Sequence, residues 1–342
     1  MARNSPRPTV ILKPEPQKSS RIFTPESLAV LHKHFTVIDL EGQDQPEVLD
    51  AALPGAFAIV GQPELGRGRL HQAPQLRAIL NVEGNFFPNV DYATCFEQGV
   101  YVLGCGPAYA QAVAEYALGL ALDIARGISR EDRAFRSGAE RYVSDGNDDA
   151  VLVRGSSIGL LGFGNLGRAL HRLLVPFAAE IRVFDPWLPE GVLREQGVIP
   201  ASLDETLTAS QFVFVLATAT AESQHLLGAR ELDLVPHRAR LVLVSRAAVV
   251  DYDALLDRIA DGRIIAGVDV WPEEPVPADH RARTLEGLVF SGHRAGGIPA
   301  AFTQIGEMVV DDLLQIVRGL PPARMQVAAR ELVDRYRNRP VG

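Results

Sequence analysis

Hydrophobic residues occur along this chain in short runs, and longer stretches with amphipathic periodicity lie between the runs. In the N-terminal third the runs predict five buried strands, at residues 9–12, 36–40, 57–60, 77–81 and 100–103. Further along they predict six more, at residues 157–161, 181–184, 212–216, 241–244, 264–268 and 288–290. Helical patterns, such as residues 25–35 and 91–98, separate the strands. This alternation predicts parallel sheets covered by helices.

Two longer helical patterns lie on either side of the second group of strands. In residues 110–128 apolar side chains recur every three or four positions, and we expect this helix to connect two domains. Residues 300–318 form the other pattern, which ends before a pair of prolines. Residues 129–154 are rich in charge and glycine, which predicts an arm or a connecting loop outside the core.

A glycine-rich turn follows the strand predicted at 157–161 and opens directly into a helical pattern. In such a turn the first glycine permits a tight bend, the second lets the backbone approach a pyrophosphate, and the third lets the helix pack closely. The N-terminus of the helix offers N–H groups to the phosphates. The residues of the turn expected to bind a dinucleotide are Gly162, Gly164, Asn165, Leu166 and Gly167.

An acidic residue, Asp185, stands at the end of the next predicted strand. A carboxylate there accepts hydrogen bonds from the ribose hydroxyls and repels a 2′-phosphate, so the sequence predicts NAD rather than NADP. Arg168 could tolerate a 2′-phosphate, but Asp185 faces the ribose more directly. We also expect Ala217, after the strand 212–216, and Ser245, after the strand 241–244, to contact the cofactor.

Three polar residues lie just beyond the ends of later strands: Arg246, Asp269 and His293. The carboxyl ends of parallel strands meet at the ligand-binding edge of an open sheet, so these side chains could converge on one nicotinamide ring. Glu274, in a proline-rich turn, is a fourth candidate, and Glu273 is the alternative beside it. A lone histidine is more often a surface or core residue, and His293 stands out only through these neighbours.

In these motifs the chain resembles the NAD-dependent, D-isomer-specific 2-hydroxyacid dehydrogenases, which include phosphoglycerate dehydrogenases and glyoxylate/hydroxypyruvate reductases. The resemblance spans roughly residues 81 to 300. Its motifs are Gly162-Phe-Gly-Asn-Leu-Gly167 with Asp185-Pro-Trp, Val244-Ser-Arg-Ala-Ala-Val-Val-Asp251, Gly267-Val-Asp-Val-Trp271 with Glu274-Pro-Val-Pro, and Gly292-His-Arg-Ala-Gly296. It implies an α/β protein of two doubly wound parallel-sheet domains. These are a flavodoxin-like substrate domain, residues 1–118 plus 300–342, and a Rossmann NAD-binding domain, residues 119–299.

The resemblance also implies the catalytic roles. His293 would exchange a proton with the substrate hydroxyl while a hydride moves between the substrate and the nicotinamide. Glu274 would orient the imidazole and stabilise its charged form. Arg246 would bind the carboxylate and the carbonyl oxygen of a D-2-hydroxy acid or 2-keto acid.

Further contacts are implied for the rest of the site. Asp269 would lie near the nicotinamide, and the backbone N–H groups of Gly84 and Asn85 would hold the substrate carboxylate. In that loop Glu83, Asn85 and residues 86–87 replace the small, glycine-rich stretch that the family pattern leads us to expect. The natural substrate stays open among 3-phosphoglycerate, glycerate and glyoxylate.

The composition limits the classes of partner and the location that we expect for this protein. The 34 basic and 42 acidic residues give a net charge of −8, which disfavours nucleic-acid binding. No apolar stretch approaches the length of about 18 residues that a membrane span needs. Two cysteines without a CxxC motif favour a reducing, cytoplasmic location, and the histidine spacing, without HExxH, predicts no metal. The resemblance implies a homodimer, with residues 110–154 as the contact.

Two other functions use the same fold. A formate dehydrogenase would carry Gln at the position of Glu274, and formate has no hydroxyl proton to remove. A dinucleotide-sensing binding protein, like the C-terminal-binding corepressors, would retain Arg246, Glu274 and His293. Turnover of a 2-keto acid with NADH separates the enzyme from this binding protein.

Overall fold

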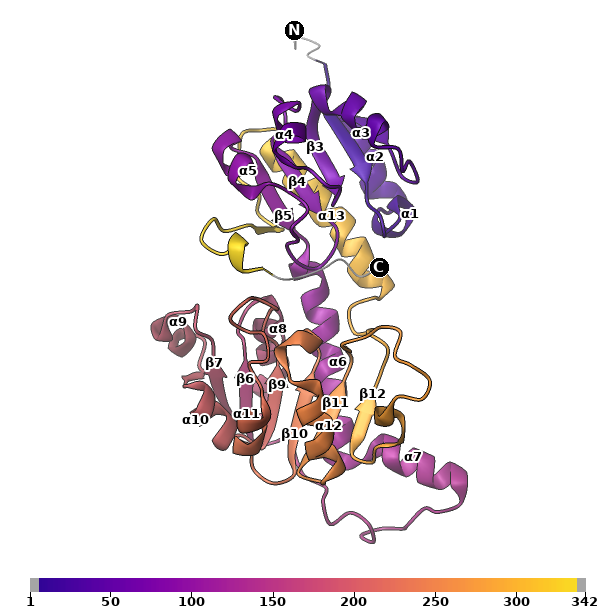
Figure 1. The fold of residues 1–342 in the computed structure, drawn as a ribbon, viewed down its shortest axis with the longest axis vertical. Coiled ribbons are helices and arrows are strands. Elements are labelled where there is room, and N and C mark those ends of the chain that lie inside the picture. The colour runs from indigo at the N-terminus through magenta and orange to yellow at the C-terminus, as the bar shows by residue number, and fades with distance from the viewer. Residues whose placement is uncertain (1–5, 337–342) are drawn as a thin grey trace. The chain divides into compact units, whose positions relative to one another are not determined.

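The computed structural model describes residues 6–336 and divides into two compact units. The first unit comprises the chain up to Tyr109 and from Gly297 onward, and the second comprises Ala110–Gly296. The N-terminal division falls within helix α6 (Gly106–Arg126), which also contains the boundary that we expect after residue 118. Each unit is a mostly parallel sheet with helices on both faces, as predicted from the sequence (Figure 1).

The first unit contains a six-stranded sheet in the order β13-β5-β4-β3-β1-β2. Its strands are β1 (Thr9–Lys13), β2 (Thr36–Asp39), β3 (Ala56–Gly61), β4 (Ala78–Asn81), β5 (Tyr101–Gly104) and β13 (Gln326–Val327). The parallel strands follow the flavodoxin-like order 2-1-3-4-5, which confirms that expectation. The antiparallel edge strand β13 was not predicted, because two residues carry no periodic pattern.

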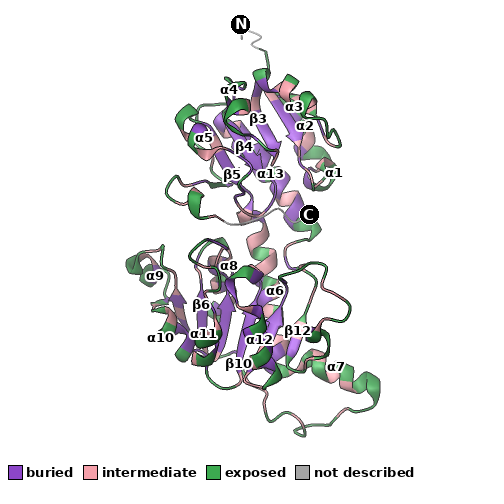
Figure 2. Ribbon diagram, viewed as in Figure 1, coloured by how far each residue is buried: buried purple, intermediate pink, exposed green. Residues whose placement is uncertain are grey.

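Side chains alternate between the faces of this sheet, as strand geometry requires. Val10 and Leu12 pack in one cluster with α13, and Ile11 packs in a second cluster on the other face. The strands are accordingly buried in Figure 2. The helical segments of the unit are α1 (Ser19–Ile22), α2 (Pro25–His34), α3 (Pro46–Ala52), η1 (Leu53–Gly55), α4 (Arg67–His71), α5 (Tyr92–Gln98), α13 (Pro299–Ile316) and η5 (Val333–Arg335).

The second unit contains a seven-stranded parallel sheet in the order β12-β11-β10-β9-β6-β7-β8. Its strands are β6 (Ser157–Leu161), β7 (Glu180–Phe184), β8 (Ile199–Pro200), β9 (Phe212–Val215), β10 (Ala239–Leu243), β11 (Ile264–Val268) and β12 (Leu288–Phe290). The chain reverses its winding direction at β6, where Rossmann domains bind dinucleotides. All six predicted strands are present, and the two-residue β8 was missed.

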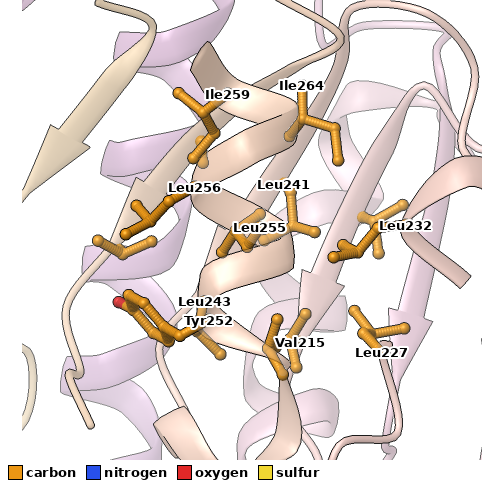
Figure 3. Packing of buried hydrophobic residues seen from close by; sticks show 14 of the residues in the cluster. Val215, Leu227, Leu232, Leu241, Leu243, Tyr252, Leu255, Leu256, Ile259 and Ile264 are labelled. Atoms are coloured by element: carbon orange, nitrogen blue, oxygen red, sulfur yellow. The ribbon is translucent and has the colours of Figure 1, made fainter. Parts of the chain in front are cut away.

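Helices cover both faces of this second sheet. In Figure 3 Leu255, Leu256 and Ile259 of α12 pack over Leu241 and Ile264 of the sheet. Besides α6, the helical segments are α7 (Ile128–Ser137), α8 (Asn165–Leu174), η2 (Val175–Phe177), α9 (Glu190–Glu195), α10 (Leu203–Thr208), α11 (Ala229–Leu234), η3 (Ala247–Val249), α12 (Tyr252–Ala260) and η4 (Arg281–Thr284). None of the helices within residues 6–336 is long and apolar enough to cross a membrane.

The segment predicted as an arm or a loop, residues 129–154, begins with a helix that the sequence analysis missed. None of the residues of helix α7 is buried, so the sequence lacks the core-facing pattern from which a helix is predicted. After α7 the chain has no helix or strand until β6. Within this stretch Asp149 forms ion pairs that attach it to the rest of the second unit. Its carboxylate accepts from Arg130 Nη1 at 3.0 Å and from Arg238 Nη2 at 2.5 Å.

Asp149 makes the stability of the protein depend on pH. Burial acts to raise the pKa of Asp149, but the two arginines hold it below its ordinary value of 3.8. A carboxyl with a lowered folded-state pKa stabilises the fold fully above its unfolded value and loses this effect as the pH falls through the folded value.

We therefore expect Asp149→Asn to lower the free energy of unfolding by about 1 kcal/mol at neutral pH, since the half-exposed arginines are screened by solvent. The difference from wild type should shrink as the pH drops below about 4. Urea unfolding at several pH values measures the difference in the free energy of unfolding. Asp148→Asn is the control, because Asp148 forms no ion pair within the described chain. Equal losses in both variants would contradict the assignment.

Candidate active site

Three predicted site residues follow three neighbouring strands of the second sheet. Arg246, Asp269 and His293 come after β10, β11 and β12, which are adjacent and parallel. Pairing continues just past the strand ends, because the N–H of Asp269 donates to the carbonyl of Leu243 at 3.0 Å. The three predicted residues therefore all lie at the carboxyl-terminal edge of the second sheet.

His293 and Glu274 form a hydrogen-bonded pair. Nδ1 of His293 lies 2.8 Å from Oε2 of Glu274, and the side chains are 26% and 31% exposed. A carboxylate only accepts hydrogen bonds, so the imidazole carries a proton on Nδ1. No residue of the described chain bonds to Nε2, which leaves this nitrogen for a ligand. In the structure Glu274, and not Glu273, is thus the hydrogen-bonded neighbour of His293.

Asp269 shapes the loop that carries His293. His293 has a φ of +53°, a left-handed conformation that residues other than glycine seldom adopt. Its N–H donates to the Asp269 carbonyl at 2.7 Å. The Asp269 carboxylate accepts from Ser291 Oγ at 2.5 Å, from Arg294 N at 2.8 Å and from Ala295 N at 2.9 Å. Asp269 is 1% exposed, so its observed role is structural, and its contact with the nicotinamide stays a prediction.

Trp271 connects the two loops that bear the histidine and the glutamate. Its backbone N–H donates to Glu274 Oε1 at 2.9 Å, and its indole N–H donates to the Ser291 carbonyl at 2.8 Å. The ring is buried beside Tyr252 and Phe290, at centroid distances of 5.4 and 6.0 Å. Trp271 lies in one of the family motifs, but the sequence predicts no role for it, because no spacing rule identifies a side chain that links two loops.

The glycine-rich turn has the geometry that its sequence predicts. Gly162 has a φ of +100°, and a Cβ there would lie 3.0 Å from the Ala217 backbone. At Gly167 a Cβ would lie 2.5 Å from the Gly162 carbonyl oxygen, which explains the close packing of the helix on the turn. Gly164 differs, since no atom lies within 4 Å of a Cβ there. It caps the N-terminus of α8, whose first turn includes Asn165 and Leu166.

The groups around the turn suit a dinucleotide. Asp185 accepts from Phe163 N at 2.8 Å and from Trp187 N at 3.0 Å, so its carboxylate is held beside the turn. The Ser245 hydroxyl is buried and has no partner in the part of the chain that the structure describes. A buried hydroxyl without a partner is costly, and a bound ligand would satisfy it. Arg246 is half-buried and donates to the Ser245 carbonyl at 2.6 Å.

The predicted substrate residues of the first unit, Gly84 and Asn85, lie in the loop after β4. The Cys105 thiol donates to the Glu83 carbonyl at 3.0 Å and helps to hold this loop. Burial raises the pKa of the Cys105 thiol well above its ordinary value, which disfavours the nucleophilic thiolate. Between residues 6 and 336 no three His, Cys, Asp or Glu side chains gather as metal ligands would.

Comparison with known proteins agrees with this geometry. Residues 118–295 match the family described as "D-isomer specific 2-hydroxyacid dehydrogenase, NAD binding domain". The chain belongs to this family. The match confirms NAD as the cofactor of this dehydrogenase, the Rossmann architecture of the second unit, and the assignment as an oxidoreductase that interconverts 2-hydroxy and 2-keto acids.

Similar proteins share most of their length with this dehydrogenase. A glyoxylate reductase of Korarchaeum cryptofilum is 30% identical over 257 residues, which cover 73% of this chain and 76% of that protein. A glyoxylate/hydroxypyruvate reductase B of Yersinia pseudotuberculosis is 29% identical over 296 residues, 84% and 90% of the two chains. The crystal structure of a phosphoglycerate oxidoreductase from Rhizobium etli has a TM-score of 0.86 at 45% identity and covers 95% and 99%.

The open space at Gly164 yields a direct test of the cofactor site. We expect Gly164→Ala to raise the Kd for NADH about tenfold or more, because the methyl group would occupy space meant for the pyrophosphate. The melting temperature should not change, since no atom of the protein clashes there. Fluorescence titration with NADH measures the Kd, and thermal unfolding measures the melting temperature. Gly191→Ala, at another open glycine, is the control. Unaltered NADH affinity in Gly164→Ala would contradict the assignment.

Proposed function

We propose that this dehydrogenase reduces a short 2-keto acid, glyoxylate or hydroxypyruvate, to the 2-hydroxy acid with NADH. The observation that carries the proposal is the 2.8 Å hydrogen bond between His293 and Glu274, which leaves Nε2 of the imidazole for a substrate oxygen. The names of two similar proteins, a glyoxylate reductase and a glyoxylate/hydroxypyruvate reductase, support the substrate class.

Each residue of the site has its own role in the proposed reduction. When bound, NADH supplies the hydride that reduces C2 of the keto acid. His293 gives the proton that converts the carbonyl oxygen into a hydroxyl, through the nitrogen not bonded to Glu274. Glu274 holds the ring in one orientation and favours its charged form. The guanidinium of Arg246 binds the substrate carboxylate and polarises the carbonyl oxygen. The family resemblance assigns a contact with the substrate carboxylate to the N–H groups of Gly84 and Asn85 as well.

Of the two alternatives, one explains the site less well and the other differs from the enzyme only in turnover. Oxidation of formate releases no hydroxyl proton, so a formate dehydrogenase has no use for a proton-transferring imidazole. A dinucleotide-sensing binding protein would keep Arg246, Glu274 and His293 without turnover. Catalysis is therefore the measurement that separates this last alternative from the enzyme.

The decisive experiment is a substrate panel. Purified protein is mixed with NADH and with glyoxylate, hydroxypyruvate or 3-phosphohydroxypyruvate, and the loss of NADH absorbance is followed. We expect the highest kcat/KM with one of the first two acids. Formate with NAD should give no reaction. If none of these keto acids is reduced, the proposed substrate class is wrong.

His293→Ala should lower kcat by about 10²- to 10⁴-fold, the usual contribution of general acid catalysis. NADH affinity should stay close to that of wild type, which fluorescence titration would show. His280→Ala is a matched control, because the His280 ring also lies near Trp271, at 5.9 Å, but does not bond to Glu274. Full activity of His293→Ala would refute the assignment.

We further infer a cytoplasmic homodimer. Large apolar side chains are exposed on α7 and the stretch after it, including Phe135 at 66%, Val143 at 91% and Leu152 at 66%. Exposed large apolar side chains that recur along one stretch of the chain favour a protein interface there. The free, buried cysteines Cys95 and Cys105 suit a reducing compartment.

Light scattering should therefore give twice the 37.1 kDa mass of one chain. Phe135→Asp should shift the protein toward the monomer, since a charge would enter the apolar contact. A wild-type protein that remains monomeric at high concentration would exclude the homodimer.

A further inference from the structure

The loop after β4, residues 82–87, is called the substrate loop below. We propose that Tyr336, in the C-terminal segment, is a positioning residue for this loop. Its ring supports Phe86, and through Phe86 it holds the backbone N–H groups of Gly84 and Asn85 in place. The inference rests on the proposed function, which assigns those N–H groups to the carboxylate of the substrate.

The C-terminal segment is attached to the edge of the first sheet. Strand β13 pairs antiparallel with β5, with Val327 opposite Leu103. The next residue, Ala328, donates its N–H to the Val102 carbonyl at 2.9 Å and is 5% exposed. In Figure 1 this segment is yellow and runs beside β5. Because this pairing is antiparallel, the residues directly after β13 run toward the start of β5, and the segment reaches the substrate loop further on, at Tyr336.

Phe86 is packed between β5 and the C-terminal segment. Its side chain is 3% exposed, and a Cβ on Gly104, the last residue of β5, would lie 3.4 Å from its ring. Its ring centroid lies 5.2 Å from that of Tyr336, with an angle of 31° between the planes. Val333 and Tyr336 pack against the cluster that contains Phe86. Tyr336 therefore completes the packing around Phe86.

Other groups hold the substrate loop at its two ends. At the start, the Val82 N–H donates to Gln62 Oε1 at 3.2 Å, and Cys105 Sγ donates to the Glu83 carbonyl. At the end, the Tyr92 hydroxyl donates to the Phe87 carbonyl at 2.6 Å. Phe86 lies between these points and directly follows Gly84 and Asn85. Its packing thus supports the loop directly beside the N–H groups assigned to the substrate.

This arrangement accounts for one departure from the glycine-rich family pattern, the aromatic residue at position 86. An aromatic residue at position 86 needs a surface to pack on, and Tyr336 and Gly104 provide it. Groups that orient a substrate must be held to within about 0.5 Å, so a loosened Phe86 would weaken carboxylate binding. Removal of one aromatic partner corresponds to about a three- to tenfold change in an equilibrium constant.

The test compares three variants under saturating NADH. Tyr336→Ala should raise the KM for glyoxylate or hydroxypyruvate about three- to tenfold, with little change in the KM for NADH. Tyr336→Phe should restore the wild-type KM, because the contact is between rings. Arg330→Ala is the matched control. This residue lies in the same segment, but its guanidinium packs over Phe96, 5.1 Å from the ring centroid, and not on the substrate loop.

Each outcome decides the question. An unchanged KM for the keto acid in Tyr336→Ala overturns the inference, as does a Tyr336→Phe variant that behaves like Tyr336→Ala. An equal rise in both KM values together with a lower melting temperature shows general destabilisation and also overturns it. If the wild-type protein reduces no keto acid, the proposed function itself fails. If the wild type turns over normally, only the role of Tyr336 is in question.

Discussion

The site depends on the buried carboxylate of Asp269. This group accepts hydrogen bonds from the Ser291 hydroxyl and from two backbone N–H groups of the loop that carries His293. These bonds hold His293 in a left-handed backbone conformation that is unfavourable without such support. The direction of the imidazole follows from this backbone, so the hydrogen bond to Glu274 also depends on Asp269.

A sheet with parallel strands explains why these loops can cooperate. Strands β10, β11 and β12 end at one edge, and each supplies one polar residue to the loops there. Trp271 joins the turn of Glu274 to the loop of His293 through two hydrogen bonds. A proton-transferring pair needs such support from regular elements, because an error of about 1 Å in its position costs much of the rate. The first unit follows the same principle, with its substrate loop held between β5 and neighbouring side chains.

Most of the architecture could be predicted from hydrophobic periodicity. Buried strands such as residues 212–216 and 264–268 are continuous apolar runs, and runs of this kind are unambiguous when helices alternate with them. Strands β8 and β13 were missed because two residues carry no period. Helix α7 was predicted as a loop or an arm because most of its residues are polar or charged and none is buried, so no core-facing stripe marks it. Elements that are stabilised by neighbours rather than by their own pattern leave no clear trace in the sequence.

The site divides in the same way. Residue order alone placed the glycines, Asp185, Arg246 and His293 at strand ends, because turn chemistry and strand polarity are local properties. The choice between two adjacent glutamates was settled only by the folded chain, in which Glu274 meets the imidazole. The structural role of Asp269, the brace formed by Trp271 and the contact of Tyr336 with Phe86 also emerged only there. Each of these joins residues from different loops, and no sequence spacing encodes a distance across loops that packing brings together.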